Sequence, residues 1–233
     1  MNATTVLLAR HGQTAWHSPN RYTGRTDIPL ARAGEEQADR LAEWAAGQGL
    51  TGLACSAQHR ARSTAAPVAA RTGLRVRVEE RLVEVDFGVA EGHTMAEMRE
   101  RDPDAVAAFL ADPAANPWPG GERPAAAVAR AYAALAEITA ADPGGRVLVV
   151  AHSTLIRLVI CAALGIPLGD YRRRLPRLDP AAVCVISLPA APAPVPDTVD
   201  GSASGVPGAA LLAYNLPVAT PCPQPNHIPT GSR

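Results

Sequence analysis

In the segment Thr5-Val6-Leu7-Leu8-Ala9-Arg10-His11-Gly12-Gln13, an arginine and a histidine come directly after an apolar run. A run of aliphatic and β-branched residues that ends near a glycine predicts a buried β-strand. In α/β proteins, ligands bind beyond the carboxyl ends of the parallel strands. An imidazole beside a guanidinium suits phosphate chemistry there, because arginine binds a phosphate dianion through a fork of donors. A single histidine after a strand is more often a structural or surface residue, so this segment alone does not define a site.

A second segment repeats the pattern. Arg146-Val147-Leu148-Val149-Val150-Ala151 also predicts a buried strand, and His152-Ser153 follows it directly. Two strands that each end in a histidine predict one site with two imidazoles, because parallel strands share a carboxyl edge.

Between these segments, helical and strand-like stretches alternate along the chain. This alternation predicts an α/β fold, a three-layer α/β/α sandwich with a mainly parallel central sheet. The helices are expected at 33–48, 59–71 (ended by Gly73), 123–141 and 155–164, and residues 94–110 are expected to form a helical insert. Further strands are expected at 49–55, 75–78 and 182–188, with 209–214 as an edge partner of the last one, and residues 84–92 are expected to form a loop.

The 233 residues are enough for one sizeable α/β domain, which we place at 1–216. Within it, 94–121 reads as a small helical and loop insert over the site. Residues 189–208 are rich in proline and glycine and are predicted to form a flexible loop. The proline-rich stretch 217–233 is predicted to be a disordered tail, whose deletion would leave turnover nearly unchanged.

Composition excludes several function classes. The chain carries 22 basic and 22 acidic residues, so no net field favours nucleic acid or an anionic membrane, and neither is expected as a partner. There is no lysine, which rules out Schiff-base chemistry. The cysteines form no CxxC pair, so neither a disulfide framework nor a zinc site is expected; they are Cys55, Cys161, Cys184 and Cys222. Without a signal-like or membrane-spanning segment, a cytoplasmic protein is expected, and the sequence leaves monomer and homodimer open.

Five ordered blocks make the chain resemble the histidine phosphatase superfamily, which includes cofactor-dependent phosphoglycerate mutases and many small phosphatases. The resemblance runs from about Thr5 to Leu188, arguably to Leu216. The blocks are Leu8-Ala9-Arg10-His11-Gly12-Gln13-Thr14; Arg21-Tyr22-Thr23-Gly24 with Asp27-Ile28-Pro29-Leu30; Cys55-Ser56 with Arg60-Ala61 and Thr64-Ala65; Leu82-Val83-Glu84 with Phe87-Gly88 and Glu91-Gly92; and Val150-Ala151-His152 with Ile156-Arg157.

The resemblance implies a role for each matching residue. His11 would be the nucleophile that forms a phosphohistidine, and Glu84 the proton donor, with Glu79, Glu80, Asp86 and Glu91 as competitors for that role. Arg10, Arg60 and His152 would offset charge on the transferring phosphoryl group. Further contacts to the substrate or its phosphate are implied for His17, Arg21, Thr23, Gly24 and Ser153. Glu91 and Glu122 are expected to be structural.

Three positions depart from the family's usual residues. His17 stands where an asparagine that bonds phosphate is frequent, Ser153 where glycine is most common, and Arg123 where serine is usual. We expect Ser153 to be tolerated if its backbone need not adopt a positive φ. These departures concern details of the phosphate pocket and the identity of the substrate more than the reaction class.

The insert favours a phosphatase over a mutase. Residues 94–121 contain two basic residues, Arg99 and Arg101. The acidic residues of the same segment outnumber them and are Glu97, Glu100, Asp102, Asp104 and Asp112. Such a segment is a poor cage for a doubly charged acid. The expected activity is therefore that of a phosphomonoesterase of the histidine acid phosphatase type, acting without metal or cofactor on a small phosphorylated metabolite. The substrate would be a sugar phosphate or a phosphoglycerate derivative. Phosphoglycerate mutase-type transfer and a catalytically impaired phosphate-ester-binding protein remain as alternatives.

Overall fold

A computed structural model describes residues 3–189 and 205–218. Most of the predicted flexible loop 189–208 and of the predicted tail 217–233 lies outside the described residues, so both remain predictions.

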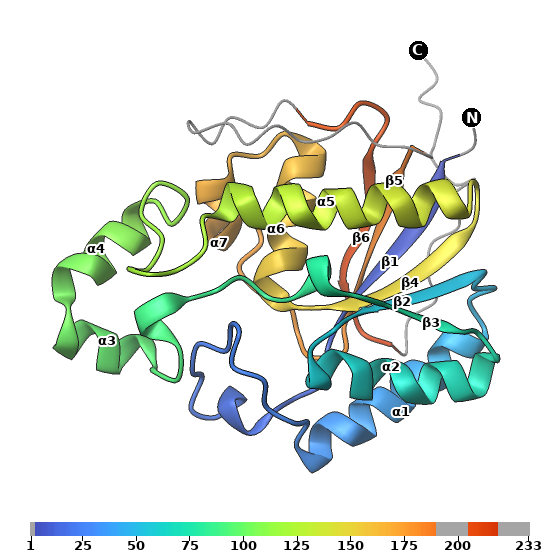
Figure 1. Cartoon of the computed structure of the whole chain (residues 1–233), viewed down its shortest axis with the longest axis horizontal. Coiled ribbons are helices and arrows are strands. Elements are labelled where there is room, and N and C mark those ends of the chain that lie inside the picture. Colours follow the sequence, from blue (N-terminus) through green and yellow to red (C-terminus); the bar gives the residue numbers. More distant parts are fainter. Residues whose placement is uncertain (1–2, 190–204, 219–233) are drawn as a thin grey trace.

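The core of the molecule is a six-stranded sheet with the order β3-β2-β4-β1-β5-β6 (Figure 1). The pairs β1–β4, β2–β4 and β2–β3 are parallel, while β5 runs antiparallel to β1, and β6 runs antiparallel to β5. The sheet is therefore mainly parallel, as predicted, with two antiparallel strands at one edge. The strands are β1 (Thr4–Arg10), β2 (Gly52–Ser56), β3 (Val76–Glu79), β4 (Arg146–Ala151), β5 (Val183–Leu188) and β6 (Ala210–Leu216).

Helices cover both faces of the sheet, which confirms the three-layer arrangement. In Figure 1, α1 (Arg32–Ala46) and α2 (His59–Thr72) lie on one side, and α5 (Pro124–Ala141) and α6 (Ser153–Leu164) on the other. Successive strand residues point to opposite faces. Val6 and Leu8 of β1 accordingly pack into the apolar cluster under α5 and α6, whereas Leu7 and Ala9 pack into the one under α1 and α2.

The ends of the longer helices follow local signals. Gly73 ends α2 in the left-handed conformation, with φ 73° and its N–H donating to the Ala69 carbonyl at 2.9 Å. Proline is well placed in the first turn of a helix, and Pro124 begins α5. The chain also forms short helical segments that the sequence patterns do not predict: η1 (Ala15–His17), η2 (Glu80–Leu82), η3 (Gly88–Ala90), η4 (Leu168–Asp170) and α7 (Tyr171–Arg174).

Residues 94–110 form a helical insert, as predicted. The insert contains two helices, α3 (Met95–Arg101) and α4 (Pro103–Ala111), which lie apart from the sheet in Figure 1. Asp102 separates them with φ −151° and ψ 80°, because a residue that precedes a proline is disfavoured in helical geometry. Its side chain then begins α4 by accepting from the Ala105 N–H at 3.0 Å.

None of the helices in the described ranges is long and apolar enough to cross a membrane.

Candidate active site

The topology brings the two predicted histidines together. β1 and β4 are parallel neighbours in which Arg10 pairs with Ala151, so the residues that follow them lie side by side. The His11 N–H donates to the Ala151 carbonyl at 3.0 Å, and the ring centroids of His11 and His152 are 5.2 Å apart. The structure thus places the two imidazoles next to each other, as the strand pattern predicted.

The ring of His11 has one nitrogen committed and one free. Nδ1 lies 2.7 Å from the carbonyl oxygen of Gly12. A carbonyl can only accept, so Nδ1 carries the hydrogen and Nε2 keeps its lone pair. Burial, with the charges of Arg60 and Arg10, lowers the pKa of His11 well below its usual value. His11 is therefore unprotonated near neutral pH, as a nucleophile requires.

Arg10 is held from two sides in the pocket wall. Its Nη1 donates to the Leu178 carbonyl at 2.6 Å, and its Nη2 lies 2.7 Å from Nε2 of His17. Mainly because of burial, the pKa of Arg10 falls to about 10, which still leaves the guanidinium charged at neutral pH.

His17 acts here as an acceptor. Both ring nitrogens face groups that can only donate: Nε2 lies 2.7 Å from Nη2 of Arg10, and Nδ1 lies 3.0 Å from the Thr14 N–H. The Thr14 hydroxyl lies 2.9 Å from the same Nδ1. Burial and the charge of Arg10 lower the pKa of His17 to about 4, which agrees with a neutral ring. His17 thus orients Arg10 in this structure, and the phosphate contact implied by the resemblance remains a prediction.

Arg60 and His152 lie behind the pocket wall and are fully buried. Arg60 donates through Nη1 to Thr26 and through Nη2 to Gly24, at 3.0 and 2.9 Å. His152 places Nε2 2.8 Å from the Ser56 hydroxyl. Burial, followed by the charge of Arg60, lowers the pKa of His152 well below its usual value.

Three side chains around His11 carry a buried nitrogen that no atom of the described chain bonds: Nε of Arg10, Nε of Arg60 and Nδ1 of His152. Buried polar groups are almost always paired, so such a group calls for an explanation. The Arg10 and Arg60 nitrogens are N–H donors. Nδ1 of His152 is one as well when Nε2 accepts from Ser56. Three such donors on residues that neighbour His11 are an arrangement that can receive an anion.

Glu84 lies in the pocket wall and is nearly fully buried. One carboxylate oxygen accepts from the Val85 and Leu155 N–H groups, both at 2.9 Å, and the other accepts from Thr154 at 3.0 Å. Glu84 therefore caps α6 and is fixed beside His11 by the helix that follows His152.

The competitors of Glu84 are engaged elsewhere. Glu79 pairs with Arg81 at 2.7 Å, Glu80 is exposed, and Asp86 accepts from the Gly88 N–H at 2.8 Å. Glu91 accepts from the Arg25 and Thr26 N–H groups, at 2.6 and 2.8 Å. Glu122 pairs with Arg130 at 2.7 Å, so both residues expected to be structural have structural partners.

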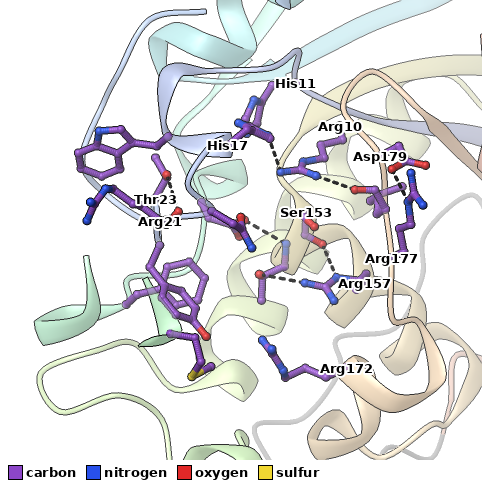
Figure 2. Close-up of a pocket in the computed structure, with 18 of the residues that line it drawn as sticks. Arg10, His11, His17, Arg21, Thr23, Ser153, Arg157, Arg172, Arg177 and Asp179 are labelled. Atoms are coloured by element: carbon purple, nitrogen blue, oxygen red, sulfur yellow. Dashed lines mark hydrogen bonds and ion pairs between the residues drawn. The ribbon is translucent and has the colours of Figure 1, made fainter. Parts of the chain in front are cut away.

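The remaining predicted contacts are distributed around an open cavity of about 360 Å³ (Figure 2). Arg21, Thr23 and Ser153 line it. Nη1 of Arg21, however, donates to the Gly92 carbonyl and to Glu97, both at 2.7 Å. Gly24 is not in the lining and instead supports Arg60 through its carbonyl. Ser153 begins α6 without a positive φ, which explains why serine replaces glycine there.

The sequence analysis missed four charged residues in the lining: Arg157, Arg172, Arg177 and Asp179. Arg157 belongs to one of the five blocks, so it could have been singled out. The other three follow α6 in segments whose direction depends on tertiary packing, and no spacing signal identifies them.

The fold and the pair of adjacent histidines together are typical of one class of proteins. A family model described as histidine phosphatase superfamily (branch 1) matches residues 6–191, and the chain belongs to that superfamily.

Among its relatives is a protein of Salmonella paratyphi B named probable phosphoglycerate mutase GpmB. The two are 32% identical over 168 residues, which cover 72% of this chain and 78% of that protein. The structure of mycobacterial glucosyl-3-phosphoglycerate phosphatase Rv2419c is similar with a TM-score of 0.77 and 28% identity, over 92% of this chain and 99% of that one. YhfR of Bacillus stearothermophilus gives a TM-score of 0.74 and 30% identity, over 84% and 99% of the two chains.

Proposed function

We propose that this chain is a phosphomonoester hydrolase that works through a phosphohistidine at His11, without a metal ion. The observation that carries the proposal is the environment of His11. Its Nε2 keeps a lone pair, and neighbouring side chains hold three buried nitrogens that have no partner among residues 3–189 and 205–218. The phosphoryl oxygens of a monoester would supply the acceptors that these nitrogens lack.

In the first half-reaction, Nε2 of His11 attacks phosphorus and the bond from phosphorus to the ester oxygen breaks. Glu84 donates its proton to the departing alkoxide, which leaves as an alcohol. Arg10, Arg60 and His152 offset the charge on the three equatorial oxygens. In the second half-reaction, Glu84 takes a proton from water, the water oxygen attacks the phosphohistidine, and inorganic phosphate leaves.

Two observations support hydrolysis over transfer between substrates. Met95 of the insert lines the cavity, whereas the two arginines of the insert, Arg99 and Arg101, do not. A structural neighbour that covers nearly the whole chain is a phosphatase by name. The relative named as a mutase keeps phosphoglycerate mutase-type transfer as the second candidate.

The test is phosphate release from an aryl phosphate and from a panel of phosphorylated metabolites, with His11→Ala beside the wild type. We expect turnover by the wild type and its loss in the variant. Acid-labile, base-stable labelling from a ³²P-ester should also depend on His11. Isomerisation of phosphoglycerates without phosphate release would favour the mutase, and binding without either reaction would favour an impaired member.

We also infer that the chain works in the cytoplasm. Cys55, Cys161 and Cys184 are buried free thiols, which suits a reducing compartment.

A further inference from the structure

Three consecutive arginines in α7 have different surroundings. Arg173 and Arg174 are exposed and lie 2.6 and 3.6 Å from the carboxylate of Asp170. Arg172 is half-buried and lines the cavity instead. Within the described chain, no carboxylate lies within 4.0 Å of its guanidinium, the limit for an ion pair.

Aromatic side chains hold Arg172 in place. Its guanidinium carbon lies 5.4 Å from the centre of the Phe109 ring. Phe109 is in turn stacked on Trp118, with centroids 4.5 Å apart and an angle of 20° between the planes. A cation over a packed aromatic face keeps its charge and loses much of its freedom. Arg172 is therefore presented to the cavity in a restricted set of orientations.

Arg157 provides a second cation without a carboxylate partner in the described residues. It is 9% exposed and lies 4.8 Å from the centre of the Tyr171 ring. Its donors reach the Ser153 and Leu175 carbonyls, at 3.1 and 3.3 Å, and these groups do not neutralise it.

The other arginines near the mouth are compensated. Arg21 pairs with Glu97 at 2.7 Å, and Arg177 pairs with Asp179 at 2.6 Å. Arg157 and Arg172 thus remain as uncompensated cations of the lining besides Arg10. Figure 2 shows Arg172 across the cavity from His11 and Arg10, with Arg157 between them.

We propose that Arg172 and Arg157 form a second anion subsite, which binds a carboxylate or a second phosphate on the alcohol part of the substrate. The inference rests on the proposed function and narrows it to phosphate esters that carry two anionic groups. The negative charge of such a substrate would be offset at both ends of the cavity. Arg10 would face the phosphoryl group, and Arg157 and Arg172 would face the second anionic group. The cations that the insert lacks are supplied from the segment after His152, so a doubly charged substrate fits.

The experiment compares two esters with one carbon skeleton. 3-Phosphoglycerate carries a carboxylate where glycerol 3-phosphate carries a neutral hydroxymethyl group. We expect the wild type to favour 3-phosphoglycerate in kcat/KM by about tenfold or more, since charge-assisted bonds have about that worth. Arg172→Gln should remove most of this preference, and Arg172→Lys should keep part of it. Fructose 1,6-bisphosphate against fructose 6-phosphate tests a second phosphate in the same way.

Arg173→Gln is the matched control, because it removes a neighbouring charge from the same helix outside the cavity. It should leave the ratio between the two esters at its wild-type value. The proposal is overturned if Arg172→Gln lowers kcat/KM for charged and neutral esters alike, or if the wild type prefers neither charged ester.

Binding separates this proposal from the proposed function. If an aryl phosphate is hydrolysed and the doubly charged esters are not preferred, the subsite is wrong and the phosphatase stands. If no ester is hydrolysed, calorimetry with 3-phosphoglycerate and glycerol 3-phosphate still decides. Binding of 3-phosphoglycerate should be the tighter of the two and should weaken about tenfold in Arg172→Gln; equal binding would overturn the subsite.

Discussion

His11, His17 and His152 share one property, a pKa lowered by burial beside arginines. Each ring is neutral near pH 7, and each neutral ring has an assigned use. His11 keeps a lone pair for the proposed attack, and His17 lies between the donors of Arg10 and Thr14. His152 has one nitrogen beside Ser56, and its other nitrogen has no partner in the part of the chain that the structure describes. Protonation of any of the three would place a new cation against Arg10 or Arg60.

Because the pKa of His11 lies well below its usual value of 6.5, the nucleophile should stay active at mildly acidic pH. We expect kcat/KM for an aryl phosphate at pH 5.5 to be within about threefold of its value at pH 7, after correction for the substrate's own ionisation. An unperturbed histidine would lose about eightfold over that range. A pH profile with an acid limb centred at 6.5 or above would contradict the assignment.

The same shifts govern stability. The pKa of His17 is about 4 in the folded chain and 6.5 when unperturbed, so between these values the unfolded chain binds the extra proton. Its contribution to stability is complete above pH 6.5 and is lost as the pH falls toward 4. His17→Asn should therefore lose less stability than the wild type between pH 6.5 and 4.5, in urea midpoints measured at each pH. His59 is exposed, so His59→Asn is the control and should lose as much stability as the wild type over this pH range. If His17→Asn also loses as much stability as the wild type, the titration of His17 does not contribute to the pH dependence.

At the scale of elements, α6 connects Glu84, the proposed acid–base residue, to His152. His152 precedes the helix, and Glu84 accepts from its Thr154 and Leu155 N–H groups. Glu84→Gln should lower kcat by about 10² to 10⁴, because the amide cannot exchange the proton. It should also destabilise the chain by about 1 kcal/mol, since one N–H loses its acceptor.

The large loss in kcat would then occur in protein that is still folded, as circular dichroism can verify. Glu80→Gln, at an exposed competitor for the same role, is the control and should keep both activity and stability. Comparable activity in Glu84→Gln and the wild type would remove Glu84 from the mechanism.

The close approach of α1 to the segment that follows β1 also positions His11, the proposed nucleophile. A Cβ at Gly34 would collide with backbone atoms of Gln13, two residues after His11, and those atoms cannot move aside like a flexible side chain. Gly34→Ala should destabilise the chain by about 1–3 kcal/mol and lower kcat/KM by displacing His11. Gly47→Ala is the control: it is exposed, and the nearest atom to its added Cβ is Trp44 O at 3.7 Å. Equal effects of the two substitutions on the unfolding midpoint would contradict this account.

Sequence patterns predicted the secondary structure correctly where neighbouring residues alone determine it. The apolar runs before His11 and His152 predicted β1 and β4, and Gly73 predicted the end of α2. The break between α3 and α4 also has a local cause, since Pro103 disfavours helical geometry at Asp102. The prediction of a helical insert did not place this break.

At the scale of the whole molecule, the chain has no formal net charge, yet its cavity concentrates arginines. Strand patterns placed Arg10 and His11 at the shared carboxyl edge of the sheet, and the family resemblance added Glu84 to the predicted site. They did not show that Arg60 and His152 lie behind the wall, nor that Arg172 faces inward while Arg173 faces out. The inward orientation of Arg172 depends on how its guanidinium packs over Phe109, a contact between distant segments that no local pattern records.

The concentration of arginines in the cavity leads to a prediction about metal ions. In the proposed mechanism, arginine and histidine donors offset the charge on the phosphoryl group. His11 can attack without a metal ion because its lowered pKa leaves the ring unprotonated. Within the described ranges, no three His, Cys, Asp or Glu side chains gather as a metal site would require. Turnover of an aryl phosphate should therefore be unchanged after dialysis against EDTA and on addition of Mg²⁺ or Zn²⁺. Loss on chelation that a divalent ion restores would mean that the ion, and not Arg10 and Arg60, carries the charge of the transition state.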